Sequence, residues 1–404
     1  MLVKMAWRNL WRNKRRTLIT MASIFFAVIL AVMMKSLKEG VYDNIIDNFA
    51  GSYLGYARIH SDGFWDDQSL DKSIETGSNL SFLESFQNIN YAPRIESFTL
   101  CSFEDRTKGG MLVGVDPIKD DEVFGLASKL EAGEYFSENE QSILVGKKLA
   151  EDLGVGIGDS LVMIGQGYRG ANAVGIYPVK GLLNMGSPDL NKLIIYLPLN
   201  EAQYFYNMFG LITAISIKPD NPEKTFKIVD KLKSKAGDSF EVLSWQELAP
   251  DIDQLIKGDR AEGTILMGIL YIIISFGIFG TVLMMLAERR HEFGILVSLG
   301  MKRSKLAITV FIEIITIAFL GSLAGLIGAF PVVFYFNQNP IAFGESNEMK
   351  KMYEEYGLEA VLQPSLDPSI FLDQTIIVCL FASIIALYPF RQILKLNSLE
   401  AMRS

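Results

Sequence analysis

Few residues of this 404-residue chain have the types and spacing that catalysis requires. Its two histidines, His60 and His291, lie far apart, and neither stands at metal-ligand spacing from a cysteine or another histidine. Residues 258–264 have the glycine spacing of a phosphate-binding loop but lack the lysine that such a loop needs. The sequence therefore predicts no catalytic, metal or nucleotide site, and no cofactor bound by this chain.

One acidic residue, Glu313, stands about two turns inside a long apolar run. Acids at such a depth face protein or water rather than lipid. A proton relay would need further ionisable groups along the same path, and the sequence offers none. The pattern favours a structural role, in which Glu313 pairs with a lysine or arginine of a neighbouring element near the cytoplasmic end.

A short basic stretch, residues 288–305, separates two long apolar runs and carries five lysines or arginines against two glutamates. Such a stretch is expected to face the cytoplasm. Four of its apolar residues recur at helical spacing: Phe293, Ile295, Leu296 and Leu299. This predicts a short helix whose apolar stripe docks into another protein. An ordinary basic loop that only sets topology is the alternative.

The N-terminal residues 1–16 are basic and carry no acid. A helix there would place Trp7, Leu10 and Trp11 on one face, which is typical of an amphipathic helix in the inner headgroup region. The next 18 residues are continuously apolar and long enough to span a bilayer. A cleavable signal peptide is the rival interpretation, but no cleavage pattern follows the run, so we expect an uncleaved first span.

Residues 39–263 are mostly polar and alternate between strand and helix patterns, flanked by two helical stalks. Strand-like segments recur at 56–60, 98–103, 111–115, 142–145, 160–164, 192–197 and 211–217. Helical patterns lie at 80–87, 147–153, 200–208 and 223–236. This alternation predicts an α+β extracytoplasmic domain.

The expected fold is a membrane protein of four transmembrane α-helices, with this large α+β domain inserted between the first and second. We divide the chain into a cytoplasmic amphipathic helix (1–16), a first span (17–38), the outer domain with stalks (39–263), a second span (264–287), a cytoplasmic loop (288–305), a third span (306–336), an acidic outer loop (337–368), a fourth span (369–390) and a cytoplasmic tail (391–404). Both termini are expected inside.

Three further features bear on partners. Gly321, Gly325 and Gly328 form a small-residue face on the third span, suited either to packing within one subunit or to a dimer contact. The net charge of −8 argues against a nucleic-acid partner. Cys101 and Cys379 fall in different compartments of this topology, so no disulfide is expected between them.

The basic stretch resembles the coupling helix of FtsX/MacB-type ABC transporter permeases. Its string EFGILVSLG (292–300), preceded by two arginines, is similar to the family pattern, with Ser298 where alanine is usual. Pieces of the outer region, including APRI (92–95) and GVDP (114–117), resemble the MacB-type periplasmic core domain. The C-terminal string SLEAMR (398–403) is similar to the family's C-terminal pattern.

This resemblance implies a mechanism of mechanotransmission. A dimeric ABC ATPase on the inner face, a separate chain that holds the ATP and Mg, would move coupling helices, spans and stalks, and so the outer domains. A second permease subunit, identical or different, would complete the complex. The residues expected to contact the ATPase are Arg289, Arg290, Glu292, Phe293, Gly294, Leu296, Leu299, Gly300 and Lys302.

Within the family, the length and the four-span layout fit the lipoprotein-releasing LolC/LolE type best. A MacB-like exporter of peptides or drugs and an FtsX-like regulator of an extracytoplasmic hydrolase are the alternatives. A lipoprotein or other amphiphilic cargo would sit between the first and second spans of two subunits in the inner membrane, and a periplasmic acceptor is a further partner. The expected cavity residues are Ile29, Leu30, Met33, Met34, Ile265, Ile269 and Ile273.

Overall fold

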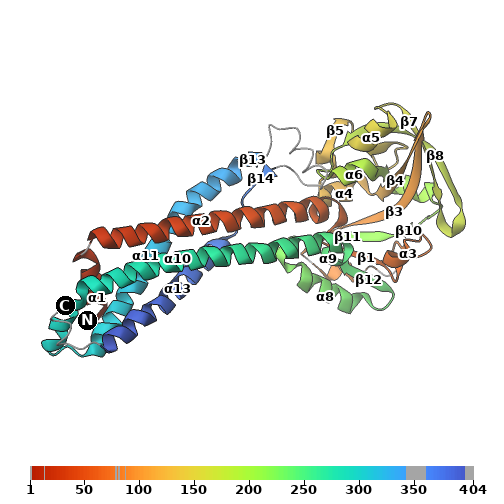
Figure 1. Ribbon diagram of the computed structural model, residues 1–404. Helices are drawn as coiled ribbons and strands as arrows, with labels where there is room; N and C mark the ends of the chain where they lie inside the picture. Colours follow the sequence, from red (N-terminus) through yellow and green to blue (C-terminus); the bar gives the residue numbers. More distant parts are fainter. Residues whose placement is uncertain are drawn as a thin grey trace. The chain divides into compact units, whose positions relative to one another are not determined.

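The structure, a computed structural model, describes residues 2–12, 14–77, 80, 82–86, 88–342 and 361–395. The chain forms two compact units (Figure 1). Among the described residues, the helical unit comprises residues 2–43, 256–342 and 361–395, and the outer unit comprises residues 44–255. The predicted outer loop and C-terminal tail lie largely outside the described residues, at 343–360 and 396–404.

Long helices dominate the helical unit: α1 (Leu2–Arg12), α2 (Lys14–Ile46), α10 (Pro250–Ser298), α11 (Arg303–Gln338) and α13 (Pro368–Leu394). Among the described residues, four helices are long and apolar enough to cross a membrane, as predicted. Two short strands, β13 (Ile341–Ala342) and β14 (Val361–Leu362), pair between α11 and α13.

The glycine face of α11 packs against α2 of the same chain. A Cβ atom added at Gly321 would lie 3.0 Å from the Cβ of Ile24, and one at Gly325 would lie 2.8 Å from the Cβ of Val28. At Gly328 it would meet the ring of Phe25 at 2.8 Å. The absence of side chains on α11 thus lets the two helices approach closely, which is the first of the two uses considered for this face.

The basic stretch does not form a helix of its own, contrary to the expectation. The single helix α10 runs from the stalk through the apolar run to Ser298. It ends in a Schellman turn, in which Met301 N–H donates to Leu296 C=O and Gly300 N–H donates to Val297 C=O, both at 3.1 Å. Gly300 supplies the positive φ of 98° that this turn requires.

The outer unit is built on a ten-stranded, mostly antiparallel sheet. Its order is β12 (Phe240–Ser244), β1 (Ala57–Ser61), β11 (Ala214–Pro219), β3 (Ile89–Phe103), β4 (Arg106–Val115), β9 (Ile194–Pro198), β6 (Ile143–Gly146), β8 (Asn172–Leu183) and β5 (Leu130–Gly133), and β7 (Ser160–Gln166) pairs with both β3 and β8. A small ladder joins β2 (Ile74–Glu75) and β10 (Leu211–Ile212).

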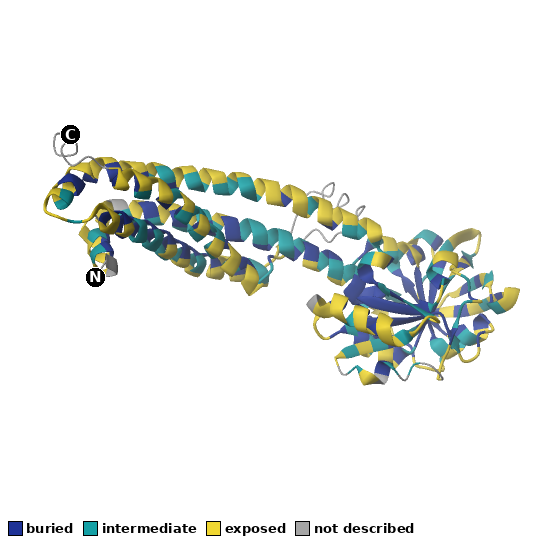
Figure 2. Ribbon diagram, turned by 90° about the horizontal axis from the view of Figure 1, so that it is seen from below, coloured by how far each residue is buried: buried dark blue, intermediate teal, exposed yellow. Residues whose placement is uncertain are grey.

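Short helices accompany the sheet: α3 (Phe64–Asp67), α4 (Pro117–Phe124), α5 (Lys147–Leu153), α6 (Pro188–Leu193), α7 (Leu199–Phe205), α8 (Thr225–Ala236) and α9 (Trp245–Leu248). The strands carry most of the buried residues, as the dark blue of Figure 2 shows. This confirms the predicted α+β domain. The helix expected at 80–87 is only a single 3₁₀ turn at Leu83–Ser85, and residues 81 and 87 lie outside the described set.

Candidate functional site

A buried ion pair joins the C-terminal part of α10 to the N-terminal part of α11. Arg289 Nη1 donates to both carboxylate oxygens of Glu313, at 2.9 and 2.8 Å. Both residues are almost fully buried, at 4% and 1% exposure. The prediction that Glu313 pairs with a basic residue of a neighbouring element is confirmed. Arg289, expected to contact an ATPase, instead lies inside the bundle because the carboxylate of Glu313 holds it there.

A second contact joins α1 to the end of α10. The Arg12 guanidinium donates to the carboxylate of Glu292, which also receives the Nε–H of Arg289 at 3.4 Å. Leu10 is buried and Thr17 Oγ1 donates to its carbonyl oxygen at 2.9 Å. Leu10 thus faces α11 and its neighbours, so only Trp7 and Trp11 of the predicted aromatic face are exposed.

The apolar stripe of the basic stretch divides between two surfaces. Phe293 is 1% exposed and packs with the bundle core, and Gly294 is also buried. Ile295 and Leu299 are exposed on the opposite side, Leu299 at 80%. The exposed surface at this end, which we call the turn surface, consists of Ile295, Leu299, Gly300 and Lys302.

The remaining predicted coupling residues divide accordingly. Arg290 and Glu292 are exposed beside the turn surface, whereas Leu296 is only partly exposed and packs against the core. The buried members of the predicted set, Arg289, Phe293 and Gly294, therefore position the turn rather than present a surface of their own.

The residues expected to form a cargo cavity are not brought together within one chain. Ile265, Ile269 and Ile273 lie on an exposed face of α10, at 66%, 51% and 63% exposure. Leu30 is exposed on α2, whereas Ile29 and Met33 pack against the bundle core. Of the predicted cargo residues, Met34 is the one that lines the pocket between α2, α10 and α13 described below. The predicted set is therefore mostly a lipid- or partner-facing surface.

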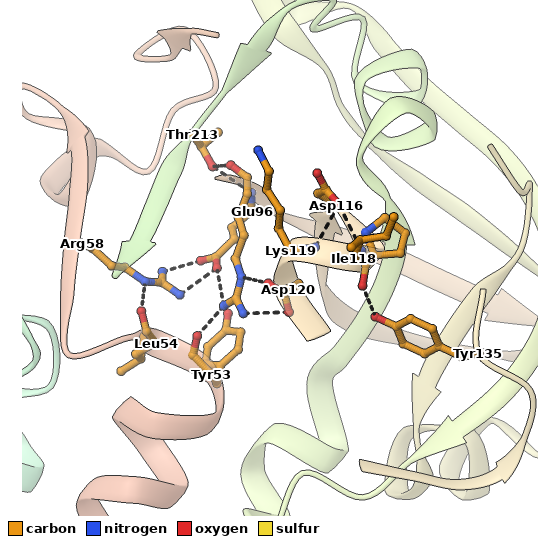
Figure 3. Close-up of polar contacts among 12 residues, drawn as sticks. Tyr53, Leu54, Arg58, Glu96, Asp116, Ile118, Lys119, Asp120, Tyr135 and Thr213 are labelled. Carbon is orange, nitrogen blue, oxygen red and sulfur yellow. Dashed lines mark hydrogen bonds and ion pairs between the residues drawn. The ribbon is translucent and has the colours of Figure 1, made fainter. Parts of the chain in front are cut away.

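In the outer unit, two buried arginines hold the end of the first stalk (Figure 3). The stalk ends in a π-helical segment, η1 (Asp47–Leu54), which continues α2. Arg58 donates to Glu96 through Nη1 and Nη2 at 2.6 and 2.8 Å, and its Nε–H donates to Leu54 C=O at 2.6 Å. These contacts satisfy a carbonyl group that the helix end leaves without an intrahelical partner.

Arg94 repeats the arrangement on β3, which is separated from β1 by β11. It donates to Asp120 of α4 through Nε and Nη2, at 2.7 and 3.0 Å, and its Nη1 donates to the carbonyl oxygen of Tyr53. Arg94 and Asp120 are both fully buried. Figure 3 shows Arg58 of β1 directed toward Leu54 and Glu96, and the Arg94 contact with Tyr53 places the second arginine, from β3, at the same turn of η1. We call Arg58, Arg94, Glu96 and Asp120 the anchor.

The electrostatics of the anchor follow from burial and charge together. Burial alone would raise the pKa of Glu96, but Arg58 and Arg94 outweigh burial and hold that pKa below its usual value. The Glu96 N–H also donates to the hydroxyl oxygen of Thr213, at 2.8 Å. The anchor is therefore a charged, hydrogen-bonded cluster that fixes the main chain of η1 to the sheet.

The chain enters and leaves the outer unit at adjacent positions. β1 follows η1 and pairs with β12, which precedes α9 and α10, and Ala57 lies opposite Ser244. Trp245 N–H donates to Tyr56 C=O at 3.0 Å, and a capping box of Ser244 and Glu247 starts α9. Both stalk connections therefore attach to neighbouring strands at one end of the sheet.

Sequence reasoning did not identify the anchor. The signal was present, since Arg58 and Arg94 both interrupt apolar strand patterns and Arg94 belongs to the APRI string. A charged residue inside a buried strand requires a partner, but the sequence does not reveal that the partners are Glu96, Asp120 and a helix end.

The described part of the chain contains no cluster of three or more histidine, cysteine or acidic side chains that could hold a metal ion. The buried histidine, His60, donates its Nδ1–H to Thr213 C=O at 3.0 Å and stacks on Phe64. Burial and the nearby Arg58 charge lower the pKa of His60 to about 4. It is a structural, neutral residue of the core.

Comparison with known families agrees with this architecture. Residues 17–235 match the MacB-like periplasmic core domain, and residues 264–398 match the FtsX-like permease C-terminal model. The chain therefore belongs to the MacB/FtsX-type ABC transporter permeases, which are multi-pass membrane proteins.

Among curated proteins, the chain is similar to the lipoprotein-releasing system transmembrane protein LolC of Xylella fastidiosa, at 25% identity over 59% of each chain. It is also similar to LolC of Haemophilus influenzae, at 20% identity over 54% of this chain and 56% of that one. The match spans less than two thirds of these relatives' length. The periplasmic region of MacB from Actinobacillus actinomycetemcomitans aligns at 16% identity over 52% of this chain and 95% of that one, with a TM-score of 0.34.

Proposed function

We propose that this chain is the permease subunit of an ABC transporter that works by mechanotransmission and extracts lipoproteins from the outer leaflet of the inner membrane. Both termini are cytoplasmic in this proposal, and the chain itself is not catalytic. Its partners are a separate ABC ATPase dimer, which binds ATP and Mg, a second permease subunit, the lipoprotein cargo and a periplasmic acceptor.

The observation that carries the proposal is the continuity of α10. One helix of 49 residues includes part of the outer unit, a whole apolar run and Ile295 of the turn surface, and it ends at Ser298, directly before Leu299. A bilayer needs only about 20 residues of helix, so the excess is available as a stalk outside and a coupling end inside. A movement of the turn surface would therefore reach the outer unit without passing through a flexible loop.

The anchor supports the same mechanism at the other stalk. Because Arg58 and Arg94 bind main-chain carbonyl groups of η1, that stalk cannot shift without moving the sheet. The resemblance to LolC favours lipoproteins as cargo, and the exposed isoleucine face of α10 (Ile265, Ile269, Ile273) supplies an apolar wall for acyl chains.

Release by the reconstituted complex tests the proposal. The full chain, its ATPase and the second permease are placed in proteoliposomes that hold a triacylated lipoprotein, and soluble lipoprotein is measured after ATP is added. Leu299→Glu should abolish ATP-dependent release, because it puts a charge in the apolar turn surface without disturbing buried groups. Ser304→Glu, an exposed position in the first turn of α11, is the matched control and should release normally.

Other outcomes decide between the alternatives. ATP-driven export of a soluble peptide, with no lipoprotein release, would assign the chain to the MacB-like exporters. Activation of a wall hydrolase by the complex, with no transport of either cargo, would assign it to the FtsX-like regulators. Normal release by Leu299→Glu would reject the turn surface as the coupling site.

A further inference from the structure

A pocket of about 420 Å³ lies within the helical unit between α2, α10 and α13. This volume is in the range of sites that bind small molecules, roughly 300–1,000 Å³. Its apolar lining includes Met34 of α2, Met267 of α10 and Ile377 of α13. It is separate from the exposed isoleucine face of α10 and from the turn surface, so neither the proposed cargo wall nor the coupling mechanism uses it.

The pocket stands where apolar runs end. The apolar run of α2 ends at Met34 and is followed by Lys35, whereas that of α10 begins at Thr264 after Gly263. The sequence topology places both positions at the outer boundary of the membrane. The pocket is therefore at the depth of lipid headgroups and ester groups.

The rim of the pocket carries charges of both signs. Lys35 pairs with Asp373 at 3.1 Å, Lys38 with Asp259 at 3.0 Å and Arg260 with Glu39 at 2.7 Å. Because each cation has an acidic neighbour, the rim does not select for a simple anion. It fits a ligand that itself carries both signs, such as a zwitterionic headgroup.

The floor of the pocket holds an unsatisfied polar group. Gln374 of α13 is 0% exposed, and its Oε1 accepts a hydrogen bond from the Tyr271 hydroxyl at 2.5 Å. Its Nε2 has no hydrogen-bond partner among the described residues. An unpaired buried donor is costly, and the acceptor that would satisfy it at this depth is a carbonyl oxygen of an acyl ester.

We propose that this pocket binds one glycerophospholipid of the outer leaflet, with its zwitterionic headgroup at the charged rim and one ester carbonyl accepting from Gln374 Nε2. The apolar lining receives the first methylene groups of the acyl chain, and Tyr271 fixes the orientation of the Gln374 amide. The bound lipid is a structural ligand of a single subunit rather than transported cargo, so the proposal rests on the topology of the proposed function but not on its cargo or its transport.

Gly268 allows a sharp test, because it lines the pocket and a Cβ added there meets no atom within 4 Å. Gly268→Leu should fill the pocket without a clash, and leucine is a better helix former than glycine. Gly277 lies on the same helix, is equally open and does not line the pocket. Gly277→Leu is therefore the matched control.

The full chain is assembled in nanodiscs of phosphatidylethanolamine and phosphatidylglycerol, extracted in detergent, and its retained phospholipid is counted by native mass spectrometry. Wild type and Gly277→Leu should retain one phosphatidylethanolamine per chain, and Gly268→Leu should retain none. The double variant Gln374→Leu/Tyr271→Phe removes both polar side-chain groups together, so neither is left unpaired. Its association constant for the phospholipid should fall by about fivefold, the effect of one net hydrogen bond. Equal retention by all variants would overturn the proposal.

A photoreactive amino acid in place of Met267 identifies the occupant directly. Adducts with phosphatidylethanolamine in nanodiscs that contain no lipoprotein, ATPase or ATP support the proposal. Adducts with lipoprotein that replace the phospholipid when lipoprotein is added would assign the pocket to cargo, and adducts with a second copy of the chain would assign it to an interface. Either result overturns the proposal, and neither depends on whether ATP-driven release is observed.

Discussion

The two units hold their buried charges in different ways. In the helical unit, the Arg289–Glu313 pair joins two side chains of neighbouring helices. In the outer unit, Arg58 and Arg94 bind carboxylates and also donate to main-chain carbonyl groups of η1. The first arrangement fixes which faces of two helices meet, whereas the second makes a helix end part of a sheet. In the proposed mechanism, the second arrangement is the one that delivers the motion of the stalk to the sheet.

The largest effect should follow Arg94→Met, which leaves Asp120 buried without its partner and Tyr53 C=O without its donor. We expect a loss of about 3–5 kcal/mol in the opening free energy of the outer sheet. Hydrogen exchange of the β3 and β4 amides in the full chain measures this quantity.

The double variant Arg94→Met/Asp120→Leu should recover most of that loss, because it leaves no unpaired charge in the core. If the β3 and β4 amides of Arg94→Met exchanged as slowly as those of the wild type, water would have to reach the anchor and solvate Asp120. The contrast between the two units would then disappear.

A smaller loss should follow Glu313→Gln in the helical unit. The amide keeps one hydrogen bond to Arg289 but removes the charge, so we expect about 2 kcal/mol of destabilisation. Resistance to unfolding by sodium dodecyl sulfate in mixed micelles measures it. A loss as large as that of Arg94→Met would mean that the two joints are equally rigid.

The outer unit should lose stability in mild acid through His60. Its pKa is lowered from 6.5 to about 4 by burial first and by Arg58 second, so the folded chain keeps the imidazole neutral. As the pH falls from 6.5 toward 4, His60 binds a proton in the unfolded chain but stays unprotonated in the folded chain. The loss should reach about 2 kcal/mol at pH 5.

His60→Asn should remove this dependence between pH 6.5 and 5, because its amide can still donate to Thr213 C=O. Hydrogen exchange of β1 at pH 7 and pH 5 compares the two proteins. A pH dependence that survives in the variant would have to come from other groups. Glu96 is distinguishable, since a carboxyl group with a lowered pKa acts at lower pH.

The smallest effect should follow Arg12→Ala. Both side chains of the Arg12–Glu292 pair are about half exposed, at 55% and 47%, so solvent screens them and the pair is worth less than about 1 kcal/mol. The same micelle unfolding assay used for Glu313→Gln applies. A loss above that of Glu313→Gln would show that α1, rather than the buried pair, holds the end of α10.

The sequence was sufficient for the architecture and for part of the site. Continuous apolar runs predicted the four spans, and alternation predicted strands such as β1, β6 and β7 at nearly the observed positions. The long strand β8 was not predicted, because Gly175, Pro178 and Gly181 interrupt its pattern. In the structure, pairing with β5, β6 and β7 holds these residues extended despite their weak strand preference.

The C-terminal end of α10 shows why the remaining features of the site could not be predicted from the sequence. Glu313 required a basic partner, and the sequence contained several candidates at the right depth. A resemblance that covers the whole EFGILVSLG string assigns all of its residues to one contact, whereas a helix has an inward and an outward face. Arg289 and Phe293 face inward and Leu299 faces outward, a division that depends on the rotation of α10 within the bundle.

The glycine face of α11 has a consequence for the internal degrees of freedom of the bundle. Gly321 and Gly325 admit Ile24 and Val28 of α2 at contact distance, so a relative slide of these helices would drive side chains into backbone. By contrast, an added Cβ at Gly268 or Gly277 of α10 meets no described atom within 4 Å. The α2–α11 pair therefore behaves kinematically as a fixed frame, and the buried Arg289–Glu313 pair ties the end of α10 to it.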